Sequence, residues 1–332
     1  MTSPMTHWER LRAAAQGAPV DHVPISLWRH WPHEDATAEG LANAMVRWQR
    51  EWDFDLVKFM PTGTYGVHDW GAATEYAPGN VGTRVVTRFG VTAPDQWPEL
   101  EQLDVGRGQY GQELEALRLA AQALDNSVPI LQTLFSPLTT ARKLAGDRIF
   151  ADLRQHPDEF KAGLQIIAET TARFAQACVE AGAHGFFLAT QCSTYRLLSE
   201  AEYREFGQPY DLLVLEAVKD RTEFNMLHVH GEDIMFDLMA SYPVQLLNWH
   251  DRLTWPTLQE AQARFAGIVV GGINDRQTLL HGTPEQVRAE VQDALAQTQG
   301  RRLVVGPGCV IPTDTPVANI RAAVEAVRSA HG

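Results

Sequence analysis

The chain has 332 residues, of which 45% are hydrophobic and 21% charged, a globular composition that excludes disordered and fibrous proteins. Its 41 acidic and 28 basic side chains give a formal net charge of −13, and no basic patch offsets this charge, which argues against nucleic-acid binding. The three cysteines are too few for a disulfide framework and no apolar run approaches ~18 residues, so we expect a cytoplasmic protein that does not span a membrane.

Buried strands and amphipathic helices alternate along the sequence. A helix is expected before residue 23. Short apolar runs that do not alternate with polar residues then predict strands buried on both faces, at 23–27, 54–60, 128–134, 185–190, 224–230, 244–250, 268–273 and 302–306. The segments between them carry apolar residues at spacings of three and four, which predicts helices with one buried face. Residues 66–110 form a longer insertion, with a hairpin expected at 81–90.

This alternation favours an α/β fold. Eight strands that alternate with helices match a closed (β/α)8 barrel of the TIM type, whereas a doubly wound open sheet is the alternative. No Gly-x-Gly-x-x-Gly turn follows the first predicted strand, which favours the barrel. No linker or repeat divides the chain, so residues 1–332 are predicted to form a single domain.

The predicted strand ends carry a candidate metal site. Active sites of such barrels lie at the carboxyl ends of the strands. His228 and His230 project to the same side of the fifth strand because side chains alternate with a period of two, and Cys309 follows the eighth strand. Two imidazoles and a thiolate with an open fourth position suit a catalytic Zn²⁺. The alternative is a histidine pair that binds substrate beside a buried cysteine.

Further polar residues at strand ends are candidates for substrate binding. Arg29 and Lys58 are placed to hold a carboxylate or phosphate of a small-molecule substrate, or else to form structural ion pairs. Asn248 and His250 end the sixth strand and are also expected to contact substrate. His250 beside Asp251 reads either as a general base or as an oriented structural pair.

Several stretches of this sequence resemble the uroporphyrinogen decarboxylase superfamily. The resemblance is carried in family order by residues 23–32, 134–147, 197–210 and 306–327, together with 227–231 and 247–252. It implies a distorted (β/α)8 barrel that often pairs as a homodimer. The family contains cofactor-free decarboxylases of uroporphyrinogen and zinc-dependent methyltransferases that move methyl groups between corrinoids and thiols.

The resemblance to the decarboxylase branch is incomplete. Arg29 and Ser193 match substrate-contacting residues of that branch, but His33 stands where a second arginine is expected. Lys143 replaces an active-site tyrosine, and Pro307 replaces a histidine. These changes argue against decarboxylation of a large tetrapyrrole.

The methyltransferase branch fits better. Its zinc ligands lie in a His-x-Cys-Gly motif and a late Gly-Cys motif. His228 and Cys309 match two of these ligands, and His230 replaces the third. The resemblance therefore implies a methyltransferase-like enzyme with bound Zn²⁺ and a corrinoid as methyl donor, delivered by a corrinoid protein.

Two other functions stay open. One is a decarboxylase of uroporphyrinogen or a smaller carboxylic acid, in which Arg29, His33 and Ser193 bind carboxylates without a metal. The other is a ligand-binding barrel without catalytic activity.

Overall fold

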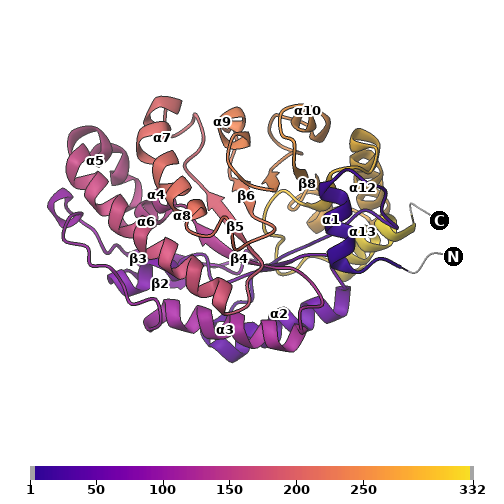
Figure 1. Ribbon diagram of the computed structural model, residues 1–332, viewed down its shortest axis with the longest axis horizontal. Helices are drawn as coiled ribbons and strands as arrows, with labels where there is room; N and C mark the ends of the chain where they lie inside the picture. Colours follow the sequence, from indigo (N-terminus) through magenta and orange to yellow (C-terminus); the bar gives the residue numbers. More distant parts are fainter. Residues whose placement is uncertain (1–3, 330–332) are drawn as a thin grey trace.

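Seven parallel strands form the main sheet of the computed structural model, which describes residues 4–329. Neighbouring strands of this sheet follow chain order (Figure 1). The strands are β1 (Val57–Phe59), β4 (Ile130–Phe135), β5 (Gly185–Thr190), β6 (Met226–Val229), β7 (Leu246–Trp249), β8 (Ile268–Ile273) and β9 (Leu303–Pro307). All strand residues except Phe135 are buried, as expected for a parallel sheet covered on both faces.

The predicted α/β barrel is confirmed, with one difference at its first strand. The seven strands curl into a half-barrel, and residues 24–26 lie between β9 and the residues that precede β1. Here Ile25 forms an isolated parallel bridge with Val305, and its carbonyl accepts the Asp55 N–H at 3.0 Å. The predicted strand at 23–27 is therefore reduced to a single bridge. Pro24 has no N–H to donate, which limits this segment's hydrogen bonding.

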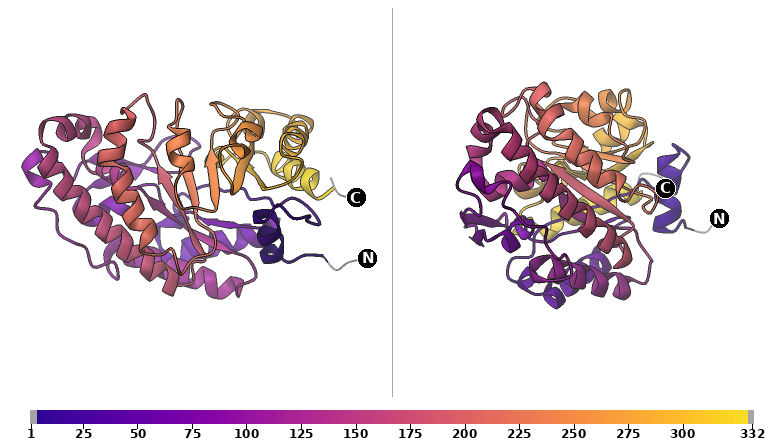
Figure 2. Two further views of the ribbon diagram at one scale, coloured as in Figure 1. Left: turned by 45° about the horizontal axis from the view of Figure 1, so that its top comes forward. Right: turned by 60° about the vertical axis from the view of Figure 1, so that its left-hand side comes forward.

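The helices lie on the outside of the curled sheet (Figure 2). Within residues 4–329 the α-helices are α1 (His7–Ala15), α2 (Ala38–Trp52), α3 (Gly108–Leu124), α4 (Pro137–Ala145), α5 (Ile149–Gln155), α6 (Pro157–Glu180), α7 (Glu200–Phe206), α8 (Gln208–Glu216), α9 (Phe236–Ala240), α10 (Leu258–Gln262), α11 (Thr278–His281), α12 (Pro284–Thr298) and α13 (Val317–Ser329). None of these helices is long and apolar enough to cross a membrane.

Helix α2 illustrates how the sequence pattern produces an outer helix. The Thr37 hydroxyl accepts the Gly40 N–H at 3.1 Å and caps the first turn. Leu41, Met45, Trp48 and Trp52 follow at spacings of four and three and are all buried. Helix α2 therefore packs one apolar face inward and lies along α3.

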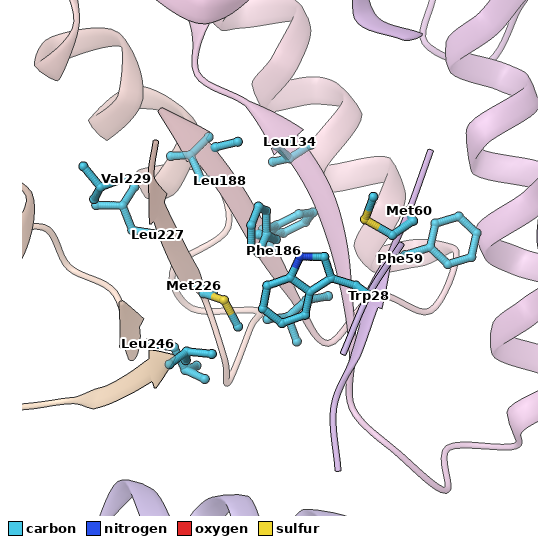
Figure 3. Packing of buried hydrophobic residues seen from close by; sticks show 14 of the residues in the cluster. Trp28, Phe59, Met60, Leu134, Phe186, Leu188, Met226, Leu227, Val229 and Leu246 are labelled. Carbon is cyan, nitrogen blue, oxygen red and sulfur yellow. The ribbon is translucent and has the colours of Figure 1, made fainter. Parts of the chain in front are cut away.

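The barrel core contains large side chains from several strands. Figure 3 shows Trp28 and Met226 among the buried hydrophobic side chains that pack beside β1. Trp28 is 1% exposed, and its ring centroid lies 5.8 Å from that of Phe187 in an edge-on contact. The middle of the barrel is thus filled, so an open site is confined to its ends.

The insertion at 66–110 contains a hairpin whose position was predicted wrongly. Strand β2 (Ala73–Tyr76) pairs antiparallel with β3 (Arg84–Arg88), so residues 81–90 supply one strand of the hairpin. Gly79 and Gly82 both have positive φ and lie between the two strands. This glycine-containing turn places the first strand before residue 81.

The expected N-terminal helix α1 is fixed to the start of β1 by a buried carboxylate. Asp55 is 0% exposed, and its Oδ1 accepts hydrogen bonds from Arg10 Nη1 at 2.5 Å and His7 Nδ1 at 2.9 Å. Its Oδ2 accepts the Ile25 N–H at 2.9 Å. One carboxylate therefore joins α1, the bridging segment and β1 at the amino-terminal ends of the strands.

Candidate metal site and its cavities

Three nitrogen and sulfur donors meet at the carboxyl ends of the strands. His228 lies in β6, His230 follows it, and Cys309 follows β9. Cys309 Sγ lies 3.8 Å from both His228 Nε2 and His230 Nδ1, and those two nitrogens are 3.4 Å apart. The structure thus brings together the three residues predicted as metal ligands.

His250 joins this cluster as a fourth donor. Its Nε2 lies 3.4 Å from His230 Nδ1, and one donor atom from each of the four residues lies within 4.8 Å of the others. The cause is strand register, because His228 pairs with Asn248 across β6 and β7. His230 and His250, each two residues further along, therefore lie side by side. The sequence identified His250 as a substrate-binding residue but could not supply the register that makes it a neighbour of His230.

Gly308 allows the Cys309 loop to approach His250. A Cβ at this position would lie 3.0 Å from the His250 Cα and 3.3 Å from its Nδ1. A larger residue would therefore displace the loop or the imidazole. The absence of a side chain at residue 308 helps Cys309 reach the histidines.

The donor distances fit a tetrahedral Zn²⁺ site. With Zn–N near 2.05 Å and Zn–S near 2.3 Å, tetrahedral angles place two nitrogens about 3.4 Å apart and a nitrogen and sulfur about 3.6 Å apart. Among His228, His230 and Cys309 the N–N distance is 3.4 Å and the two N–S distances are 3.8 Å. The absence of a carboxylate from this donor set disfavours Mg²⁺ and Ca²⁺.

Burial keeps the site histidines in the neutral form that can bind a metal. Burial, together with the neighbouring His230 and His250, lowers the pKa of His228 well below its ordinary value. The pKa of His230 is lowered as well, chiefly by burial. Neutral imidazoles can present a lone pair without first losing a proton.

Asn248 lies beneath this cluster and is 0% exposed. Its Oδ1 accepts a hydrogen bond from His228 Nδ1 at 2.6 Å. The substrate contact expected of Asn248 is therefore replaced by a contact with a candidate metal ligand.

A cavity of about 250 Å³ adjoins the cluster and is lined by basic side chains. No aspartate or glutamate is found among the described residues that line it, although the chain as a whole is acidic. Lys58 and Lys143 line it beside an apolar wall that includes Phe135 and Phe187. The two ammonium groups lie 4.1 Å from the Phe187 ring centroid and 3.1 Å from the Phe135 ring centroid, respectively.

Burial makes these ammonium groups poorly solvated. It lowers the pKa of Lys58 to about 7 and the pKa of Lys143 well below its ordinary value. Thr64 Oγ1 and His30 Nδ1, from two other lining residues, have no hydrogen-bond partner within residues 4–329. Two amines and two unpaired polar atoms therefore converge on a cavity that could accept an anionic group.

A second, more open hollow of about 380 Å³ lies on the other side of the cluster. It is lined by His230 and His250 and extends over Thr194, Arg196 and Leu253. Gln191, His230 and Arg276 line both spaces. The cluster therefore borders both the basic cavity and the more open hollow.

Besides Asn248, three of the predicted substrate-binding residues line neither the basic cavity nor the open hollow. The Arg29 guanidinium packs 4.3 Å from the Trp31 ring centroid and donates to the Thr313 carbonyl at 2.8 Å. His33 is exposed, with its ring 4.5 Å from that of Tyr76. Ser193 is 0% exposed and exchanges a 2.8 Å hydrogen bond with Thr190 Oγ1.

Alternation explains the position of Arg29. Trp28 points into the barrel core, so its neighbour Arg29 points outward toward α2. Lys143, not proposed as a substrate-binding residue from sequence, lines the cavity where Arg29 does not. Its position after the third predicted strand placed it near the strand ends, but the direction of its side chain depends on how α4 packs.

Comparisons with known proteins show which family and which relatives the chain resembles. A family model described as uroporphyrinogen decarboxylase (URO-D) matches residues 6–330. A methylcobamide:CoM methyltransferase, MtbA of Methanosarcina acetivorans, is 23% identical over 97% of each chain. The methylcobamide:CoM methyltransferase MtaA of Methanosarcina barkeri is 26% identical over 96% of each chain.

A solved structure shares the fold over nearly the whole chain. It is described as a methyltransferase from Methanosarcina mazei and superimposes with a TM-score of 0.84. It is 24% identical and covers 97% of this chain and 98% of its own. This likeness supports the barrel architecture described above.

Proposed function

This chain belongs to the uroporphyrinogen decarboxylase (URO-D) family, and from that premise we propose that it is a zinc-dependent methyltransferase-like enzyme. Its reaction would move a methyl group between a corrinoid or another donor and a thiol-type acceptor. The observation that carries the proposal is the cluster of His228, His230, His250 and Cys309, whose donor atoms lie within 4.8 Å of one another. The two relatives named above, which span nearly the same length, carry out methyl transfer involving a corrinoid and a thiol according to their names.

The cluster would supply the activation that a thiol acceptor needs. Zn²⁺ held by these residues would lower the pKa of a bound thiol and favour the thiolate. His228, His230 and Cys309 form the tightest set of three donors, with His250 beside them. The sulfur would form a bond to the methyl carbon while the bond from methyl to its donor breaks. The electron pair of the broken bond stays with the donor, and the thiol proton passes to solvent.

Lys58 and Lys143 would orient the acceptor through an anionic group. Both ammonium groups face a cavity whose described lining contains no carboxylate, so a bound sulfonate, phosphate or carboxylate would be their natural counter-charge. The Phe135 and Phe187 side of the cavity would contact the carbon chain. This arrangement would direct the opposite, sulfur-bearing end of the acceptor toward Cys309 and the histidines.

The open hollow is the proposed entry side for the methyl donor. It borders His230 and His250 and is wider open to solvent than the basic cavity. A corrinoid macrocycle is bulky and would approach from this side, carried by a corrinoid protein. Donor and acceptor would then reach the cluster from different directions without competing for one space.

The placement of residues gives less support to a decarboxylase. That alternative relies on Arg29, His33 and Ser193 to bind carboxylates, and in the described chain none of the three lines either space beside the cluster. The polar cluster and cavity also favour catalysis over a ligand-binding barrel without activity. We further propose a cytoplasmic location, where Cys309 would stay reduced; all three cysteines are free in the structure.

The test is methyl transfer from free methylcobalamin to two thiols, coenzyme M and uncharged 2-mercaptoethanol. We expect zinc-loaded wild-type protein to demethylate methylcobalamin faster with coenzyme M than with 2-mercaptoethanol. Cys309→Ser should lose this activity with both thiols. Cys178→Ser is the matched control, because Cys178 is a fully buried cysteine of α6 outside the cluster. Equal rates for wild type and Cys309→Ser, or no transfer to any thiol by the zinc-loaded protein, would contradict the proposal.

A further inference from the structure

Asn248 makes three hydrogen bonds around the metal cluster. Its Oδ1 accepts from His228 Nδ1 at 2.6 Å, and its Nδ2 donates to the carbonyls of Val270 at 2.9 Å and Pro307 at 3.0 Å. Asn248 is 0% exposed, so water does not compete for these bonds. Both N–H groups of the amide and one lone pair of its oxygen are therefore directed at protein groups.

These bonds determine which way the amide faces. A backbone carbonyl accepts but cannot donate, so the side facing Val270 and Pro307 must be the NH₂ group. The oxygen then faces His228, whose Nδ1 must carry the proton. The lone pair of the neutral ring consequently lies on Nε2, the atom next to His230 Nδ1 and Cys309 Sγ.

The Asn248 amide also holds in place the segment that carries the Cys309 thiol. Pro307 is the last residue of β9, and Cys309 follows two residues later. The bond to Pro307 therefore ties the base of the Cys309 loop to β7, while the bond to His228 ties β6 to β7. One side chain thus links a histidine and a cysteine that lie 81 residues apart.

We propose that Asn248 is a positioning residue that sets the His228 tautomer and the place of the Cys309 loop before any metal binds. The effect on metal binding rests on the proposed function, whereas the effect on the tautomer does not. Asn248 acts through His228 and the loop, without itself contacting metal or substrate. Comparable partners of ligating histidines change metal affinity by ~10–100-fold when they are removed.

The first test is ¹⁵N NMR of the histidine rings in metal-free protein, with His228 assigned from His228→Gln. We expect wild type to hold His228 with the proton on Nδ1, and Asn248→Leu to shift it toward a mixture of tautomers. Asn248→Asp keeps an oxygen that accepts from His228 and should restore the wild-type tautomer. A proton on His228 Nε2 in the wild-type protein would overturn the proposal, and this measurement needs no variant of Asn248 to fold.

The second test is Zn²⁺ affinity measured by competition with a chelator. Asn225→Leu is the matched control, since Asn225 is 3% exposed and binds Phe186 N–H and Thr222 Oγ1 away from the cluster. Asn248→Leu should bind Zn²⁺ ~10–100-fold more weakly than this control. Equal affinities would overturn the proposal. If wild type binds no Zn²⁺ while His228 keeps its proton on Nδ1, the proposed function fails and the positioning role stands.

Discussion

His228 Nε2 lies 3.8 Å from Cys309 Sγ, although 81 residues separate the two in the chain. Between their strands in the sheet lie β7 and β8, so this contact crosses the mouth of the curled sheet. In a flat sheet two such strand ends would lie about three strand spacings, roughly 14 Å, apart, so the curl of the sheet brings them together. The contact therefore connects the barrel architecture directly with the candidate chemistry.

Removing the amine of Lys58 or Lys143, which a bound anion would keep protonated, should weaken the binding of an anionic acceptor. In Lys58→Met and Lys143→Met we expect the KM for coenzyme M to rise by ~10–100-fold, the range expected for a lost hydrogen bond to a charged group. The KM for 2-mercaptoethanol should change little. Lys219→Met, at an exposed lysine, is the control. Parallel changes for both thiols would mean that the lysines do not bind the acceptor's anionic group.

The sequence predicted most of the sheet because buried parallel strands have continuous apolar runs. It was less accurate where a strand's behaviour depends on its partners, as at 23–27, where a single bridge at Ile25 replaces a strand. The hairpin was misplaced because the turn glycines precede most of the segment judged to form it. Local pattern identified the elements, and their pairing required the structure.

The same division applies to the site. His228 and His230 could be paired from strand periodicity, and Cys309 from its place at a strand end. The direction of Arg29 and the register that puts His250 beside His230 depend on packing between distant segments. Lys143 likewise reaches the cavity from a helix, whose rotation the sequence did not specify.

His250→Ala should test whether three donors suffice to hold a metal. His228, His230 and Cys309 form the closest set, so we expect this variant to keep Zn²⁺ with reduced affinity. Cys309→Ala removes the sulfur donor of that set, so its affinity for Zn²⁺ should fall further than that of His250→Ala. Chelator competition on both proteins makes the comparison. A greater loss of affinity in His250→Ala than in Cys309→Ala would assign the principal ligand set differently.

Helix α1 should contribute pH-dependent stability through His7. Burial alone would lower the pKa of His7, but its hydrogen bond to Asp55 and the charges of Asp55 and Asp53 outweigh this and raise the pKa above 6.5. Protonated His7 therefore stabilises the folded state fully below pH 6.5, and this contribution is lost as the pH rises through the raised pKa.

Urea unfolding as a function of pH would measure this effect. The difference in free energy of unfolding between wild type and His7→Gln should be largest below pH 6.5 and should shrink at higher pH. His281→Gln, at an exposed histidine of α11, provides a comparison. A difference that grows with rising pH would show that the sign of the His7 contribution is opposite to the one inferred.

Metal content of protein purified without chelator, after growth with added zinc, tests the metal site most directly. The proteins to compare are wild type, His228→Ala, Cys309→Ala and the control Cys178→Ala. We predict about one zinc per chain in wild type and the control, and a clear loss in the other two. Metal-free wild type, or zinc retained in both His228→Ala and Cys309→Ala, would contradict a metal site built on these residues.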